Sequence, residues 1–322
     1  MRHIITGGSG FVGSALTRLL AARGAEIVNF DLVPPANQLD LRHMDVIQGD
    51  VTRSEDLERL ALRSDDVVYH LAARQFAGSL PARGRCQWFR DVNVIGTRNV
   101  LGAMRVAGAR HLVYFSTDMT YGIPTACPVP PTHPQNPLGP YGRSKLAAEK
   151  HIRDAGICAT IFRPRLITGP GRLGILAQLF RLIRVGLPVP MIGSGNNRYQ
   201  MVGVEDCARA AILAVEKNCP RGPFNLGSNA PPTTRKLLSE IIRHAGTRSF
   251  LVPMPAALLK YVLSLLDMSG FTLLYPEQFR IADLDILLDT TETERVLGWQ
   301  PLLTDIEMMN AAYDTFNARI VD

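Results

Sequence analysis

The stretch that decides the fold lies near the start of the chain and reads Ile4-Ile5-Thr6-Gly7-Gly8-Ser9-Gly10-Phe11-Val12-Gly13. Two β-branched residues lead into a glycine-rich turn, and the residues after Gly13 have helical spacing, so the pattern predicts a strand, a tight turn and a helix. Gly7, Gly10 and Gly13 stand where a side chain would hinder the turn, the approach of a pyrophosphate, and the packing of the helix on the strand. The N–H groups that begin such a helix can bind phosphates. A glycine triad alone is weak evidence for a dinucleotide site.

The next apolar run, residues 26–30, strengthens this interpretation because it ends in Asp31. A carboxylate at the end of a second strand is placed to bind the ribose hydroxyls of adenosine. The two features together predict a dinucleotide-binding unit at the start of the chain.

The composition is typical of an ordinary globular protein with a sizeable core, since 46% of the 322 residues are hydrophobic and 20% are charged. The net charge is +6, but Lys and Arg are scattered singly among acids, which argues against nucleic acid and favours an anionic small molecule. The five cysteines form no CxxC pair, so we expect neither a metal site nor a disulfide framework. No apolar run approaches the ~20 residues that span a bilayer, and the first strand begins directly after Met1. We therefore expect no transmembrane segment, no signal peptide and a cytoplasmic location.

Apolar runs and helical patterns alternate after the opening unit, which predicts an α/β fold with a doubly wound parallel sheet. Strands are expected at residues 46–51, 66–73 and 111–115. Asp50 could meet the adenine or cap a helix at 54–62, and the two interpretations are about even. His70 is interpreted as a packed core residue. Asn93 lies near the start of a helix expected at 91–107 and would face the sheet.

The strand at 111–115 delivers a hydroxyl-rich segment, residues 116–122, to the carboxyl edge of the sheet. Tyr141 and Lys145 follow at the head of a helix, one turn apart on one face. An ammonium in that position lowers the pKa of a phenol, which can then exchange a proton with a hydroxyl as hydride moves. In isolation the pair would indicate only an exposed helix face. After a hydroxyl-rich strand end in a dinucleotide-binding chain, it indicates catalysis.

These residues resemble the extended short-chain dehydrogenase/reductase family, of the NAD-dependent nucleotide-sugar epimerase/dehydratase type. The shared motifs occur in family order along almost the whole chain: TGGSGFVG at 6–13, Asp31, Gly49-Asp50-Val51, HLAA at 70–73, Asn93 in DVNVIGT, STDMTYG at 116–122, YGRSKLAAE at 141–149, RPRLITGPG at 163–171, Val204-Glu205-Asp206, Phe224-Asn225-Leu226-Gly227 and LGWQP at 297–301.

The resemblance implies a role for each matching residue. Tyr141 would be the catalytic base and acid, Lys145 its pKa-lowering partner and a ligand of the nicotinamide ribose, and Thr117 the hydroxyl that binds the reacting oxygen. Asp31 implies NAD rather than NADP, because a carboxylate repels a 2′-phosphate and no arginine follows directly to receive one. The implied cofactor contacts are Gly7, Gly10, Phe11, Val12, Gly13, Asp31, Asp50, Val51, Leu71, Ala72, Ala73, Asn93, Tyr141, Lys145 and Pro164.

The chain also departs from the family pattern. Met119 stands where sugar-nucleotide 4,6-dehydratases carry the glutamate that acts as base, and a thioether cannot accept a proton. Asp118 beside it is therefore interpreted as a loop-capping carboxylate. Leu166 and Tyr199 replace the asparagine and arginine that usually hold the substrate diphosphate. Substrate contacts, including arginines for an anionic diphosphate, are expected from Asp118, Met119, Arg165, Arg172 and Arg198.

We expect residues 1–165 to form the NAD-binding Rossmann domain, rejoined by about 200–227. Residues 166–199 and 228–322 would form a smaller, discontinuous, mostly helical substrate cap. The apolar stretch 251–275 is interpreted as a cap helix packed on the core or on a dimer partner rather than as an interfacial membrane helix.

The function expected is that of an NAD-dependent nucleotide-sugar epimerase, a homodimer that oxidises a sugar hydroxyl to a transient ketone and then returns the hydride. The alternative is a hydroxysteroid-dehydrogenase-like enzyme or ketone reductase acting on a hydrophobic alcohol or ketone. A non-catalytic NAD-sensing protein is disfavoured because Thr117, Tyr141 and Lys145 are all present.

Overall fold

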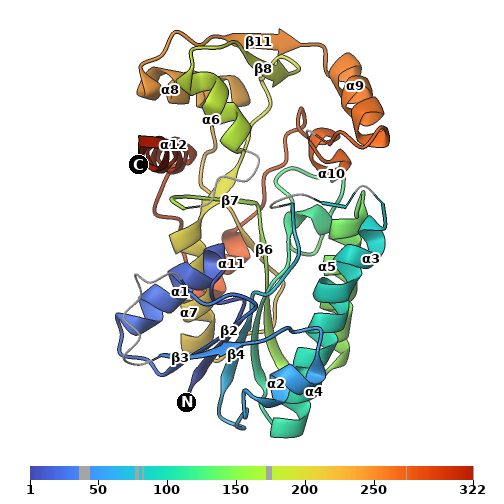
Figure 1. Ribbon diagram of the computed structural model, residues 1–322, viewed down its shortest axis with the longest axis vertical. Helices are drawn as coiled ribbons and strands as arrows, with labels where there is room; N and C mark the ends of the chain where they lie inside the picture. The colour runs from blue at the N-terminus through green and yellow to red at the C-terminus, as the bar shows by residue number, and fades with distance from the viewer. Residues whose placement is uncertain (36–43, 77–79, 82, 172–175, 273, 322) are drawn as a thin grey trace.

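The computed structural model describes residues 1–35, 44–76, 80–81, 83–171, 176–272 and 274–321. They form a seven-stranded sheet in the order β10-β6-β5-β4-β1-β2-β3, and each neighbouring pair of strands is parallel. Helices cover both faces of this sheet, and a second layer of helices and short strands lies above its upper end (Figure 1). The chain has the doubly wound α/β fold that its sequence predicts. The strands of the sheet are β1 (His3–Thr6), β2 (Ile27–Asp31), β3 (Met44–Gln48), β4 (Val67–His70), β5 (His111–Phe115), β6 (Cys158–Pro164) and β10 (Phe224–Leu226).

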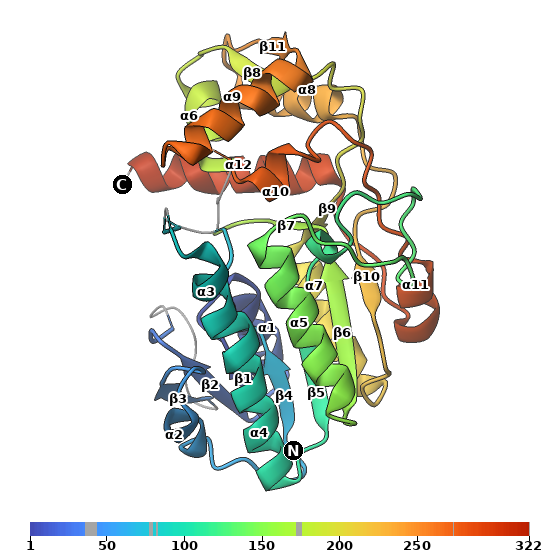
Figure 2. The same ribbon diagram turned by 90° about the vertical axis from the view of Figure 1, so that its right-hand side faces the viewer.

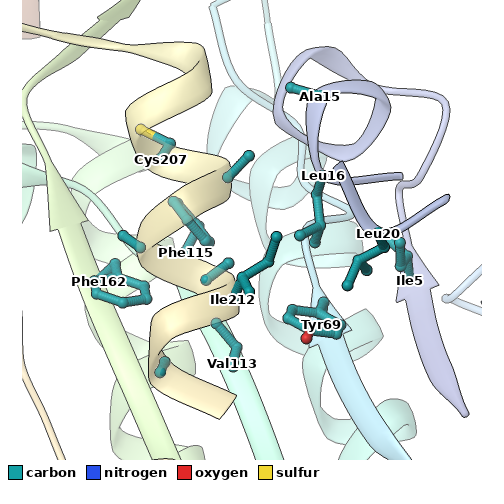
Figure 3. Packing of buried hydrophobic residues seen from close by; sticks show 14 of the residues in the cluster. Ile5, Ala15, Leu16, Leu20, Tyr69, Val113, Phe115, Phe162, Cys207 and Ile212 are labelled. Atoms are coloured by element: carbon teal, nitrogen blue, oxygen red, sulfur yellow. The ribbon is translucent and has the colours of Figure 1, made fainter. Parts of the chain in front are cut away.

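The two faces of the sheet are buried by different helices, because successive side chains of a strand point to opposite sides. On one face Ile5 packs in a cluster with residues of α1 (Phe11–Ala21) and α7 (Val204–Glu216) (Figure 3). On the other, Ile4 packs with residues of α4 (Thr97–Ala107) and α5 (Pro140–Asp154). Burial on both faces explains why these strands are continuously apolar rather than alternating.

His70 at the end of β4 is a packed core residue, as predicted. Its two ring nitrogens lie 2.7 Å from the hydroxyl of Thr6 and 2.9 Å from that of Thr97. Burial lowers the pKa of the imidazole to about 3, helped by the charge of Lys145. The ring is therefore neutral and binds its neighbours by hydrogen bonds.

The layer above the sheet, which we call the cap, has a core of its own. Phe180, Leu237 and Phe316 belong to its buried cluster. Its helices are α6 (Leu176–Arg184), α8 (Thr234–Ala245), α9 (Ala256–Met268), α10 (Pro276–Phe279) and α12 (Asp305–Val321). Two parallel strand pairs accompany them: β8 (Val189–Ile192) with β11 (Leu251–Met254), and β7 (Leu166–Thr168) with β9 (Met201–Gly203). One helix from this late part of the chain, α11 (Thr291–Leu297), lies instead beside the sheet (Figure 2).

The apolar stretch at 251–275 contains β11 and α9. Along α9 Leu263 is buried, whereas Leu258, Tyr261, Leu265 and Met268 are exposed. Within the described ranges, no helix combines the length and apolar character needed to cross a membrane.

Several expected elements have different bounds from those observed. The strand expected at 66–73 is shorter, because β4 ends at His70. The third strand occupies Met44–Gln48 rather than 46–51, and it ends where a Cβ on Gly49 would lie 2.5 Å from the ring of Phe30. The second helix, α2 (Ser54–Glu58), is shorter than the expected 54–62, and Ala61 has a left-handed φ of 43°. The helix expected at 91–107 begins earlier, as α3 (Arg85–Arg90), and residues Asp91–Gly96 form a π-helical turn before α4.

Candidate active site

A cavity of about 530 Å³ lies where the glycine-rich turn, the carboxyl ends of the strands and the cap meet. Most of the residues predicted for the site line it. They are Gly7, Gly10, Phe11, Val12, Gly13, Asp31, Asp50, Val51, Leu71, Ala72, Ala73, Thr117, Asp118, Met119, Tyr141, Lys145, Pro164 and Arg165. This edge of a doubly wound sheet is where such folds bind ligands.

The glycine-rich turn is packed so closely that side chains would not fit at two of its positions. Gly7 has a left-handed φ of 76°, and a Cβ there would lie 2.5 Å from the backbone nitrogen of Ala72. A Cβ on Gly13 would lie 2.2 Å from the carbonyl oxygen of Gly7. The amino end of α1, capped by Gly10 without a side-chain bond, points its N–H groups toward the cavity region. The turn is therefore a cradle of backbone donors that suits a pyrophosphate.

Asp31 and Asp50 also line the cavity, near the glycine-rich turn. The carboxylate of Asp31 accepts a hydrogen bond from the Ser9 N–H at 3.0 Å, which fixes it beside the turn. Asp50 accepts the Thr52 N–H at 2.8 Å, so it stabilises the start of the following loop while also lining the cavity. Asp50 does not cap α2, because the N-cap residue of that helix is Arg53 and no side chain caps it. The contact of Asp50 with the adenine stays a prediction.

Asn93 does not line the cavity, in contrast to the other predicted cofactor residues. Its buried amide accepts the Arg74 N–H at 2.8 Å and donates to the Arg74 carbonyl and to the Ser144 hydroxyl. The π-helical turn that carries Asn93 therefore ties the segment after β4 to α5. Its contribution to the site is to hold these two elements in place.

Thr117 follows the end of β5, Tyr141 and Lys145 lie on α5, and all three line the same cavity. The ammonium of Lys145 lies 4.4 Å from the centre of the Tyr114 ring and is 3% exposed. Burial lowers the pKa of Lys145 to about 7, and the charge of Glu149 opposes this shift. The Glu149 carboxylate is itself held by Arg163 at 2.6 Å. A lysine this deeply buried is unusual outside functional sites.

Asp118 has a partner that its sequence context does not reveal. Its Oδ2 lies 2.6 Å from Nη1 of Arg165, and both side chains are buried. The Arg165 guanidinium also lies 5.2 Å from the centre of the Tyr199 ring. Asp118 is thus a paired carboxylate inside the cavity rather than a loop cap. Met119 lines the cavity beside it without a group that could accept a proton.

Of the other two predicted arginines, Arg198 lies away from this cavity. Arg198 forms an exposed ion pair with Asp285 at 3.0 Å and is absent from the cavity lining. Arg172 lies outside the described residues.

Sequence reasoning missed the side chains that the cap and the loop after β4 contribute. Phe76 lines the cavity from the segment after β4, Trp88 lines it from α3, and Gln278, Ile281 and Ala282 line it from the cap. No periodicity or motif marks these residues, because only the tertiary fold brings them to the site.

Comparison with known proteins adds independent evidence. The family model described as "NAD dependent epimerase/dehydratase family" matches residues 3–227. The chain is 30% identical to the 2-alkyl-3-oxoalkanoate reductase of Stenotrophomonas maltophilia, over 76% of each protein. It is 25% identical to the UDP-glucose 4-epimerase of Vibrio cholerae, over 92% of this chain and 90% of that enzyme. Among solved structures, the UDP-glucose 4-epimerase of Thermotoga maritima with UDP-glucose superposes with a TM-score of 0.80 at 24% identity, covering 99% of this chain and 100% of that one. This last likeness concerns the fold.

Proposed function

Because the chain belongs to the NAD-dependent epimerase/dehydratase family, we propose that it is a nucleotide-sugar 4-epimerase, which oxidises a sugar hydroxyl and then returns the hydride. The family match confirms the resemblance to the extended short-chain dehydrogenases/reductases and NAD as the cofactor. The observation that carries the proposal is the convergence of Thr117, Tyr141 and Lys145 on the cavity that also holds the glycine-rich turn.

The residues of the cavity fit NAD. Gly10, Phe11 and Val12 at the amino end of α1 line the cavity, so this turn can offer backbone N–H groups to a pyrophosphate. Asp31, fixed by Ser9, offers a carboxylate to the adenosine ribose. NAD supplies a hydride acceptor and donor when bound.

The protein's own groups handle the proton and the substrate oxygen. The phenol oxygen of Tyr141 would take the proton of the reacting hydroxyl and later return it. Thr117 would hold the reacting oxygen by a hydrogen bond from its hydroxyl. The charged form of Lys145 would stabilise the deprotonated phenol, since opposite charges favour one another at short range in a dry site.

Dehydration is disfavoured by the residues around Asp118. Elimination of water next to a ketone needs a base at the adjacent carbon, and Met119 cannot act as one. The Asp118 carboxylate is already paired with Arg165. We therefore propose a redox-neutral isomerisation without loss of water.

A reductase of hydrophobic substrates is the second candidate, because the cap's part of the cavity wall is mostly apolar. Leu166, Ile167, Leu176 and Ile281 line it. Arg165, which a substrate diphosphate would need, is engaged by Asp118. A 2-alkyl-3-oxoalkanoate reductase is among the relatives.

The test is to incubate the purified protein with UDP-, GDP-, CDP- and dTDP-hexoses and, separately, with long-chain 3-keto acids and ketosteroids. Substrate mass and NADH absorbance are followed together, with Tyr141→Phe as the inactive control. An unchanged mass, an inverted stereocentre and no accumulating NADH support the epimerase. Loss of one water would establish dehydration instead, and stoichiometric turnover of NADH with a keto substrate would establish the reductase.

We further propose that the enzyme is a cytoplasmic homodimer acting on a nucleotide sugar. Light scattering of the protein as it elutes from a size-exclusion column measures the oligomeric state. Fractionation of the cells that produce the protein measures its cellular location. A monomer at micromolar protein concentration would contradict the proposed homodimer.

A further inference from the structure

One short segment of the cap, residues 275–282, contacts both the cavity and the helix that carries Tyr141. Its helix α10 lies directly above the upper end of α5 in both views (Figure 1 and Figure 2). Gln278, Ile281 and Ala282 line the cavity. Glu277, between Pro276 and Gln278, is not part of that lining and is 4% exposed.

Glu277 caps the first turn of α5 from a distant part of the chain. Its Oε1 accepts the Tyr141 N–H at 2.9 Å, and its Oε2 accepts the Gly142 N–H at 3.0 Å. The first N–H groups of a helix have no partner within the helix, and the N-cap residue Gly139 has no side chain to supply one. The carboxylate of Glu277 therefore satisfies two donors that would otherwise be buried without partners.

Gly139 makes this approach possible. A Cβ at Gly139 would lie 2.3 Å from Cγ and 2.4 Å from Cδ of Glu277. The φ of Gly139 is −148°, an extended conformation that alanine also adopts. Glycine at position 139 therefore allows Glu277 to approach the helix. The backbone conformation itself does not require glycine.

The same cap segment also contacts the Tyr141 ring through one intermediate side chain. The ring of Tyr275 stacks on that of Phe76 with centroids 4.6 Å apart. Phe76 in turn meets the Tyr141 ring edge-on at 4.9 Å. The cap therefore restrains both the backbone and the ring of Tyr141.

We propose that Glu277 is a positioning residue for the reaction, through which the cap places Tyr141. This rests on the proposed function, since it takes Tyr141 as the proton-transferring group. The segment that holds Tyr141 also lines the cavity through Gln278, Ile281 and Ala282, so the position of the cap and the position of the phenol are coupled.

The test compares Glu277→Ala, Glu277→Gln and Gly139→Ala with the wild-type enzyme in steady-state kinetics, NAD titration and hydrogen exchange of the Tyr141 and Gly142 amides. We expect Glu277→Ala to lower kcat about tenfold or more, because two charge-assisted hydrogen bonds to the helix are lost. KM and the Kd of NAD should change by less than about threefold, since no cavity-lining group is removed. Glu277→Gln should retain intermediate activity, because an amide oxygen can accept one of the two N–H groups.

Gly139→Ala provides an independent perturbation, because its methyl group displaces the Glu277 carboxylate without straining the backbone. It should reproduce the loss in kcat and the faster exchange of the two amides. When Glu277 is already alanine, the methyl group of Gly139→Ala meets no carboxylate. Adding Gly139→Ala to Glu277→Ala should therefore lower kcat little further. This non-additivity distinguishes the contact from two unrelated defects.

Asp305→Asn is the matched control. Asp305 is also a buried carboxylate and accepts the Met201 N–H at 2.6 Å, but it does not line the cavity. This variant should lose stability while keeping wild-type kcat per folded molecule and wild-type exchange at Tyr141. Unchanged exchange and kcat in Glu277→Ala would overturn the proposal. If the wild-type protein shows no epimerase activity, the proposed function fails, while the exchange measurement still reports on Glu277.

Discussion

Replacing Lys145 by methionine tests whether the ammonium is held in a dry site at an energetic cost. Burial lowers the pKa of Lys145 from 10.5 to about 7. Each unit corresponds to about 1.4 kcal/mol, so the charged form is disfavoured in the folded protein by about 5 kcal/mol. Methionine has nearly the same length and carries no charge, so it removes this cost while preserving most of the packing against Tyr114.

The sign of the pH dependence follows from proton counting. Between pH 7 and 10.5 the unfolded chain keeps its proton on Lys145 while the folded protein loses it, so stability rises with pH across this window. The cost falls from about 4 kcal/mol at pH 7 to about 2 kcal/mol at pH 9. From pH 7 to pH 9, the free energy of unfolding of the wild-type protein should therefore rise by about 2 kcal/mol more than that of Lys145→Met.

The assay is urea unfolding of both proteins at pH 7 and pH 9 without added cofactor. Lys150→Met is the control, because Lys150 is the exposed lysine on the same helix and loses the same formal charge. Its stability should follow the wild-type pH dependence. A difference between the wild-type protein and Lys145→Met that stays constant with pH would refute the reasoning. Despite its stability, Lys145→Met should be inactive and bind NAD weakly.

Three further outcomes are expected. Tyr141→Phe should abolish turnover while changing the Kd of NAD less than about threefold, since only the phenolic oxygen is lost; turnover in this variant would contradict its role. Asp31→Ser should weaken NAD binding and narrow the preference over NADP, as competitive titration would measure, because the charge that repels a 2′-phosphate is gone; an unchanged ratio of the two Kd values would argue against this role. Arg163→Met should lower the free energy of unfolding by about 3–5 kcal/mol in urea titration, because the buried Glu149 loses its buried cation and keeps only the half-exposed Arg153; a loss below about 1 kcal/mol would contradict it.

Local signals in the sequence predicted the parts of the molecule that are built locally. The glycine-rich turn, Asp31 at the end of β2, and the Tyr141–Lys145 spacing each combine a strand or helix with the residue that follows it, and all of these residues line the cavity. The predicted limits of the third strand, 46–51, differ from the observed 44–48, because these limits depend on the neighbouring strand and on the ring of Phe30. The limits of the two domains stay a prediction.

Contacts between distant segments could not be predicted in this way. The sequence alone predicts a loop cap for Asp118, because its partner Arg165 follows 47 residues later, between β6 and β7. Glu277 lies 136 residues from the N–H group of Tyr141 that it binds. Arg198 fitted a diphosphate by its sequence position, yet Asp285 engages it outside the cavity. Pairings of this kind depend on how the cap folds over the sheet, which no local pattern encodes.

The path of the chain between the sheet and the cap limits how this enzyme can be rebuilt. The chain leaves the sheet after β6, returns at α7, leaves again after β10, comes back at α11 and ends in the cap with α12. The cap is therefore not one continuous segment, and it could not be exchanged for the cap of a relative through only two junctions. Any graft would need several compatible junctions at once, and the one after β6 lies in the cavity wall. New substrate ranges on this scaffold are more accessible by point substitution in the connecting segments than by recombination of whole domains.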